Sequence, residues 1–270
     1  MHPIEHLRYV ARAQGADPSS LVEETAHALG SLHFDPSGLV VACRRIVERH
    51  PFTGPLWWLC ANVVTSAEPF EAVWELSDEV RSDRTGAELA AVLPDDATVV
   101  TIGDPDVIGD GLIRRGDVRV LALDAGYTAT SFVRRLERYD VAVEAVDAGV
   151  AGAAVGHADV VLVEALAVDP GRVIVPIGSS TIAATAAALG REVWIVAGVG
   201  RRLPSGFLDA MVAKVDALAA EHDPWDLDVE VLPTSMFTHV VGPHGRMPMG
   251  PPAIVAECPM AHELLRSSHI

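Results

Sequence analysis

The sequence predicts an α/β protein, with a Rossmann-like, mainly parallel sheet preceded by a helical N-terminal domain. Three observations predict this fold. Apolar residues recur at helical spacing up to about residue 92. Beyond that point short apolar runs alternate with amphipathic segments, which is the pattern of right-handed βαβ crossovers. Residues 157–200 then hold two nearly continuous apolar runs, typical of parallel strands covered on both faces.

The first predicted domain, residues 1–92, should consist of several short helices. Proline and hydroxyl or acidic residues stand at the expected helix starts. The helices are expected from Ser19 or Ser20, from Asp35 to residue 47, after Pro51, over 69–80 and over 85–92. Trp57 and Trp58 lie on the third of these helices, where their large apolar surfaces indicate core or interface packing.

The second predicted domain, residues 93–270, should contain the sheet. Strands are expected over 98–103, 118–123, 141–146, 160–167, 174–177, 193–197 and 229–232, and helices over 108–115, 131–139, 181–190 and 204–220. The strands up to residue 200 are assigned to one parallel sheet. The glycines of segment 149–156 lack the GxGxxG spacing of a dinucleotide loop and are expected in tight turns. From Gly242 the chain is expected to be loop with a short terminal helix.

Composition excludes several classes of protein. The formal net charge of −17 disfavours a nucleic-acid partner, because such proteins need a basic face. Cys43, Cys60 and Cys258 are widely spaced and form no CxxC, which argues against a disulfide framework and a thiolate zinc site and favours a reducing cytoplasm. The chain starts without a secretory-signal pattern, and no apolar run approaches the ~18 residues of a membrane span. The histidines are scattered singly, so neither a metal nor a cofactor is predicted.

One candidate ligand site is the start of the predicted Ala-rich helix. Gly178, Ser179, Ser180 and Thr181 would present free backbone N–H groups and three hydroxyls at the positive end of the helix dipole. This arrangement suits an anion such as a phosphate. The alternative is that Ser179 or Ser180 only caps the helix.

Three carboxylates are candidates for acid-base chemistry. Asp104 and Asp106 follow the first predicted strand at its carboxyl end, the usual edge for ligand contacts in open α/β sheets. Asp-Pro after a strand is also an ordinary turn and helix start. Glu164 interrupts an apolar run, and a carboxylate there must reach solvent, a partner or a ligand, because burying it alone costs several kcal/mol.

Segment 157–200 carries a family resemblance. Val163-Glu-Ala-Leu166, Asp169-Pro-Gly-Arg and Val175-Pro-Ile-Gly-Ser179 stand where the family has a strand ending in Val-Gly-Ala-Asp, a short turn, and Asn-Lys-Ile-Gly-Thr opening a helix. The family unites the α, β and δ subunits of eukaryotic initiation factor 2B with methylthioribose-1-phosphate isomerase and ribose-1,5-bisphosphate isomerase. The chain resembles a divergent, bacterial-type member.

Other segments match in the same order, over roughly residues 35–248. His50-Pro-Phe-Thr-Gly-Pro-Leu-Trp-Trp58 resembles the family's Arg-Pro-Thr-Ala-Val-Asn-Leu-x-Trp helix start. Asp223-Pro-Trp-Asp-Leu-Asp is similar to Asn-Pro-x-Phe-Asp, and Phe237-Thr-His-Val-Val-Gly-Pro-His-Gly resembles the continuation Ile-x-x-Val-Thr-Glu-x-Gly. The resemblance implies a dimer formed through the α/β domains.

The departures from the family fall on its chemistry. Gly103 stands where the isomerases have a catalytic cysteine, Leu166 where they have an aspartate, and Val175-Pro176 where they have a phosphate-contacting Asn-Lys pair. The family's other substrate elements find no counterpart around 124–128. Aldose-ketose isomerisation by the family route therefore lacks its acid-base groups.

The sequence thus favours a cytoplasmic, initiation-factor-2B-like regulatory or assembly protein without isomerase activity. It would bind a small anionic metabolite, a sugar phosphate or a nucleotide, near residues 178–181 and Gly103, and would form a homodimer or pair with a related subunit. The alternative is a phosphosugar isomerase or lyase whose rebuilt site uses Asp104, Asp106 and Glu164 as acid-base groups.

Overall fold

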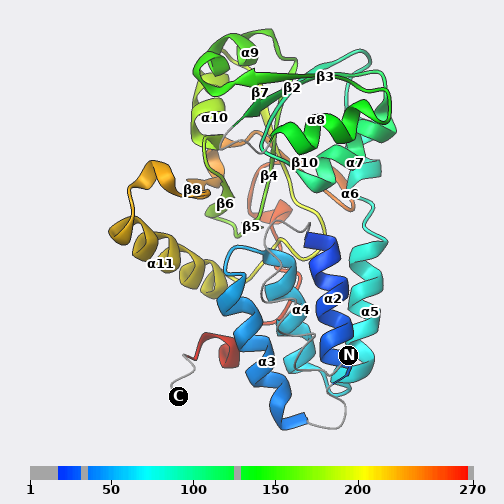
Figure 1. Ribbon diagram of the computed structural model, residues 1–270, viewed down its shortest axis with the longest axis vertical. Helices are drawn as coiled ribbons and strands as arrows, with labels where there is room; N and C mark the ends of the chain where they lie inside the picture. The colour runs from blue at the N-terminus through cyan, green and yellow to red at the C-terminus, as the bar shows by residue number, and fades with distance from the viewer. Residues whose placement is uncertain (1–17, 32–35, 125–128, 267–270) are drawn as a thin grey trace.

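The computed structural model describes residues 18–31, 36–124 and 129–266 (Figure 1). The expected features at residues 1–17, at Asp35 and at 125–128 lie outside this range. Helices α2–α5 form one end of the molecule and the large sheet with its helices forms the other (Figure 1). This arrangement confirms the predicted α/β, Rossmann-like fold with a helical N-terminal region. The domain boundary between residues 92 and 93 stays a prediction.

The helical region is built around α4. Its helices are α2 (Pro18–Gly30), α3 (Pro36–Arg49), α4 (Gly54–Thr65) and α5 (Pro69–Arg81). Prolines in the first turns of α4 and α5 suit helix starts, because the N–H that proline lacks would have no partner there. Nine of the twelve residues of α4 are buried, since the other helices surround it. Trp57 and Trp58 are both in this core, as predicted.

The main sheet has seven strands in the order β10-β9-β7-β4-β1-β2-β3. They are β1 (Thr98–Ile102), β2 (Arg119–Asp124), β3 (Ala142–Asp147), β4 (Val160–Glu164), β7 (Glu192–Val196), β9 (His239–Gly242) and β10 (Gly245–Pro248). All neighbouring pairs are parallel except β9 and β10. The central strand β4 is buried along its whole length, which explains the apolar residues 160–163 that precede Glu164.

Helices cover both faces of this sheet. Side chains of α6 (Thr85–Val92), α7 (Asp106–Arg115) and α8 (Ala129–Glu137) share one apolar core with the sheet. Those of α9 (Ala151–His157) and α10 (Ser179–Ala188) share a second core with it. The long helix α11 (Ser205–Glu221) instead packs Phe207 and Met211 into the core of the helical region.

A second, antiparallel sheet corrects the predicted single sheet. It consists of β5 (Ala167–Val168), β6 (Arg172–Pro176) and β8 (Val229–Pro233). The expected strand 160–167 therefore divides between two sheets, and β6 does not join its parallel neighbours. The reason is the turn at Asp169, whose carboxylate accepts the N–H groups of Gly171 and Arg172 and folds β6 back onto β5.

Two further expectations were wrong. The chain around Gly242 forms the hairpin β9–β10 rather than loop, because β9 continues the parallel sheet beside β7 and β10 folds back along it. Gly152 and Gly156 lie in α9 rather than in tight turns, whereas Gly149 does lie in a turn, the 3₁₀ turn η1 (Ala148–Val150). That turn forms because Asp147 accepts the N–H of Gly149. The last helix within the described residues is the short 3₁₀ helix η5 (His262–Leu265), close to the short helix expected there.

The start of α4 lies directly against the main-chain atoms that follow β4 and β7. The Gly54 N–H donates to the carbonyl of Leu166 at 3.0 Å. A Cβ at position 54 would lie 2.4 Å from that oxygen and 3.2 Å from the carbonyl oxygen of Gly200. The close approach of backbone to backbone therefore requires glycine.

Gly54→Ala should lower the free energy of unfolding by about 1–3 kcal/mol, because rigid main-chain atoms must move to admit the methyl group. Chemical denaturation of the two proteins measures the difference. Gly152→Ala is the matched control, because a Cβ there meets no atom within 4 Å. The control should be neutral or slightly stabilising. Equal effects at the two positions would contradict the packing argument.

The Asp169 turn predicts an acid-sensitive contribution to stability. Burial is the largest influence and raises the pKa of Asp169, but hydrogen bonds from the Arg172 guanidinium and from the N–H groups of Gly171 and Arg172 together lower the pKa below its ordinary value. A carboxyl group whose pKa is lower in the folded state than in the unfolded state stabilises the folded protein. This contribution is fully present at pH values above the unfolded-state pKa, which is about 3.9 for aspartate. The contribution disappears as the pH falls through the folded pKa.

Asp169→Asn should therefore destabilise the protein at neutral pH by about 1–3 kcal/mol. The difference from the parent should shrink as the pH is lowered below about 4. Urea titrations across this range measure it. A difference that stays constant with pH would show that the carboxylate charge contributes nothing.

Candidate functional site

The carboxyl ends of the parallel strands face the helical region, and the predicted carboxylates lie there. Gly103 follows β1 with a positive φ of 76°, which suits glycine, and turns the chain toward Asp104 and Asp106. Asp106 begins α7, and Glu164 is the last residue of the adjacent strand β4. The structure thus brings Asp106 and Glu164 together at the start of one helix.

Glu164 is buried and fully partnered. Its side chain is 6% exposed, and one oxygen lies 2.6 Å from Nη1 of Arg201, which is 3% exposed. The carboxylate also accepts the N–H of Ile108 at 3.0 Å and that of Asp106 at 3.3 Å. Arg201 Nη1 donates to the carbonyl of Ala165 as well, at 2.9 Å. Glu164 therefore caps α7 and neutralises a buried guanidinium, so the partner that its sequence position demanded is Arg201.

Asp106 and Asp104 also have partners within the chain. Asp106 Oδ1 lies 3.2 Å from Arg135 Nη1, and its Oδ2 accepts a hydrogen bond from the Ser19 hydroxyl at 3.4 Å. Arg135 Nη2 donates to the carbonyl of Pro105 at 2.6 Å, which fixes the guanidinium beside the helix start. Asp104 is exposed and accepts a hydrogen bond from the Ser131 hydroxyl on α8. Asp104 thus points to α8, whereas Glu164 points to Arg201.

The start of α10 is positioned by the small sheet, because β6 leads directly into it. Gly178 adopts a φ of 88° as the N-cap residue. The Ser179 hydroxyl is buried and donates to the carbonyl of Pro176 at 2.6 Å. The Ser180 N–H donates to the carboxylate of Glu230, from β8, at 2.7 Å. Thr181 is exposed at this end. One N–H of the predicted anion site therefore contacts an internal anion.

A cavity of about 350 Å³ lies between the helical region and α7. Asp106 is the predicted site residue that lines it. The other polar lining residues are Ser19, Ser20, Glu23, Ser77, Arg81, Asp83, Asp110 and Arg114. The walls carry four carboxylates and two guanidiniums, so the cavity is polar and mixed in charge.

Sequence reasoning missed the basic partners of the site. Arg201 directly follows the Gly-Val-Gly segment after β7, and Arg135 lies on α8. The presence of a carboxylate in a buried strand signals that a cation is needed, but nothing in the sequence specifies which one. The sequence did not indicate a role for Glu230, because polar and apolar residues commonly alternate along a short strand and a glutamate is ordinary there.

Within the described ranges, no group of three or more histidine, cysteine, aspartate or glutamate side chains is arranged to hold a metal ion. None of the helices in these ranges is long and apolar enough to span a membrane. No protein-family model and no curated protein matches the chain.

Solved structures do match over nearly the whole chain. The translation initiation factor eIF-2B of Pyrococcus horikoshii OT3 superimposes with a TM-score of 0.77 at 14% identity, covering 94% of this chain and 98% of that one. eIF2B beta of Chaetomium thermophilum superimposes with a TM-score of 0.70 at 14% identity, covering 99% of this chain and 93% of that one. A chain of the tetrameric eIF2B-beta2-delta2 complex from the same organism superimposes with a TM-score of 0.71 at 13% identity, covering 93% of this chain and 91% of that one. The chain therefore has the fold of the eIF2B-type proteins.

Proposed function

We propose that this protein is a non-catalytic, initiation-factor-2B-like regulatory or assembly protein that binds a small anionic metabolite. The proposal rests mainly on one observation, that the carboxylate of Glu164 is fully occupied by contacts within the chain. A general base must direct a lone pair at its substrate. Both oxygens of Glu164 instead accept hydrogen bonds from the chain itself, and Arg201 neutralises its charge.

The neighbouring carboxylates support the same interpretation. Asp106 is paired with Arg135, and Asp104 accepts a hydrogen bond from Ser131. Gly103 and Leu166 supply no acid or base where the resembling isomerases have a cysteine and an aspartate. The polar groups at this edge of the sheet therefore serve to hold α7 and α8, and the isomerase alternative receives no support from a specific contact.

Assembly is supported by the fold. One of the matching structures is a tetrameric complex of eIF2B beta and delta chains. We infer that this chain forms a homodimer or pairs with a related subunit. The wide spacing of its cysteines supports a cytoplasmic location.

The metabolite is proposed to bind at the start of α10. The contact between Ser180 N–H and Glu230 supports this position, because it places an anionic oxygen where a phosphate oxygen would lie. An incoming anion would displace the Glu230 carboxylate and use Thr181 as a further donor. Glu230 would then weaken anion binding in the parent protein by competing for the N–H.

Two measurements test the proposal. Light scattering after gel filtration should give a mass about twice 28.6 kDa for a homodimer. Thermal shift with ribose phosphates and nucleoside monophosphates should raise the melting temperature without turnover by NMR. The shift should be larger in Glu230→Gln than in the parent, and unchanged in the control Glu192→Gln. A monomer that none of these anions stabilises would overturn the proposal, as would a conversion that Asp104→Asn abolishes.

A further inference from the structure

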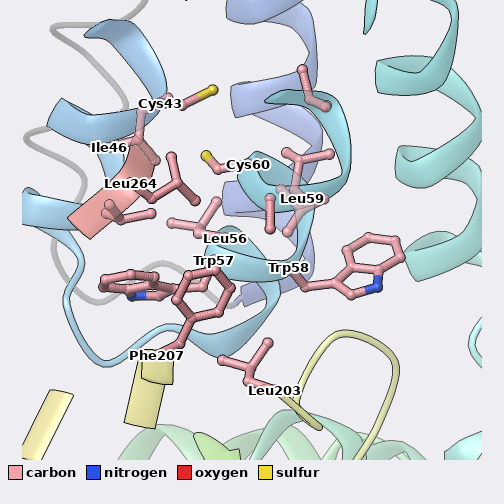
Figure 2. Packing of buried hydrophobic residues seen from close by; sticks show 14 of the residues in the cluster. Cys43, Ile46, Leu56, Trp57, Trp58, Leu59, Cys60, Leu203, Phe207 and Leu264 are labelled. Carbon is pink, nitrogen blue, oxygen red and sulfur yellow. The ribbon is translucent and has the colours of Figure 1, made fainter. Parts of the chain in front are cut away.

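Two of the three cysteines, whose wide spacing argued against a disulfide framework, meet in the core of the helical region. Cys43 lies on α3 and Cys60 on α4, and Figure 2 shows their sulfur atoms near each other between the two helices. Both residues are fully buried. Both are free thiols. Neighbouring thiols on adjacent helices are the arrangement from which a disulfide can close.

The elements that cover this pair lie at the edge of the molecule. Ile46, Leu56 and Leu264 surround the two thiols (Figure 2). Leu264 belongs to η5, the C-terminal turn that packs on α3, and Arg44 Nε donates to the carbonyl of Glu263 there at 2.5 Å. Helix α3 is thus held between α4 and a short terminal turn. Local opening is easiest for such peripheral elements.

We propose that Cys43 and Cys60 are a redox modification site, at which hydrogen peroxide forms a reversible disulfide that links α3 to α4. One thiol attacks peroxide, which yields a sulfenic acid and one water. The second thiol then displaces hydroxide from that sulfur, and the S–S bond and a second water result. The two sulfurs lose two electrons in total, peroxide gains them, and both thiol protons end in water.

The terminal turn controls access to this site. In the closed state the hydrogen bond with Cys43, and then burial, raise the pKa of Cys60 well above its ordinary value, so its thiolate is scarce. Only the thiolate attacks peroxide. Separation of η5 from α3 admits water and peroxide and returns the thiol toward its ordinary acidity. The rate of oxidation should therefore follow the frequency of this opening.

The test uses the full chain carrying Cys258→Ser, so that the pair is isolated from the third cysteine. After peroxide treatment the intact mass should fall by about 2 Da, corresponding to two hydrogens. The melting temperature should rise by about 5–10 °C, because the crosslink constrains the unfolded chain. Dithiothreitol should reverse both changes. The control Cys43→Ser with Cys258→Ser should show neither change.

Leu264→Ala tests the role of the terminal turn. It should accelerate disulfide formation several-fold, because η5 then packs less tightly over the thiols. A mass gain from separate oxidation of the two sulfurs, or two thiols still titratable in denaturant after treatment, would overturn the disulfide. An unchanged oxidation rate in Leu264→Ala would overturn access through η5. Because the readouts are mass and thiol content, they do not depend on the proposed metabolite.

Discussion

Glu164→Ala is expected to lower the free energy of unfolding by about 3–5 kcal/mol, because it leaves Arg201 buried without its counter-charge. Arg201 is 3% exposed, and apart from Glu164 its Nη1 contacts only the neutral carbonyl of Ala165 among the hydrogen bonds within the described residues. The substitution also removes the acceptor for the N–H groups of Asp106 and Ile108, so the first turn of α7 loses its cap. Urea denaturation at neutral pH measures the change.

The exposed pair of Arg119 and Glu144 supplies the matched control. Both of its side chains are 62% exposed, so Glu144→Ala should cost less than about 1 kcal/mol. Replacing both partners of the buried pair, as Glu164→Leu with Arg201→Met, should recover part of the loss, because no unpaired charge remains. A cost at Glu164 no greater than that at Glu144 would show that water reaches Arg201.

The correctly predicted parts of the fold are the helices and strands whose formation is determined by residues within the same segment. Helices α4 and α5 have prolines in their first turns, and β1, β4 and β7 are short, mainly apolar segments covered on both faces. Each of these signals lies within one segment and does not depend on the rest of the chain. Glu164 was also identified locally, because a carboxylate inside an apolar run must have a partner.

The parts that could not be predicted depend on distant segments. Arg201 lies 37 positions from Glu164, and Glu230 lies 50 positions from Ser180, so both contacts exist only after the sheets have formed. The Asp169 turn pairs β6 with β5, but the second sheet is completed by β8, more than fifty residues further along the chain. The sequence of a short apolar strand does not indicate which sheet the strand joins. For the same reason the spacing of Cys43 and Cys60 gave no sign that they meet.

Trp58→Ala should lower the free energy of unfolding by about 3–5 kcal/mol, because it removes one of the largest fully buried side chains and leaves a cavity. Trp58 is 1% exposed. Its ring packs on Gly200, where an added Cβ would lie 3.2 Å from the indole carbons. Its Nε1 donates to the carbonyl of Glu257 at 3.1 Å, and that residue's carboxylate accepts the Gly200 N–H and pairs with Arg202. The indole therefore links α4 to both the segment after β7 and the C-terminal segment.

A comparison of three variants separates packing from the hydrogen bond. Trp58→Phe keeps most of the apolar volume but loses the donor, so its cost should be about 1–3 kcal/mol, the cost of an unsatisfied carbonyl. Trp225→Ala is the control, because that side chain is 75% exposed and its removal should change stability by less than about 0.5 kcal/mol. If Trp58→Ala and Trp58→Phe lower the free energy of unfolding equally, the stabilisation by Trp58 would come from its hydrogen bond to Glu257 rather than from packing. If Trp58→Ala matches Trp225→Ala, α4 does not depend on this indole, and the sheet must be held to the helical region by other contacts, among them that of Gly54 with Leu166.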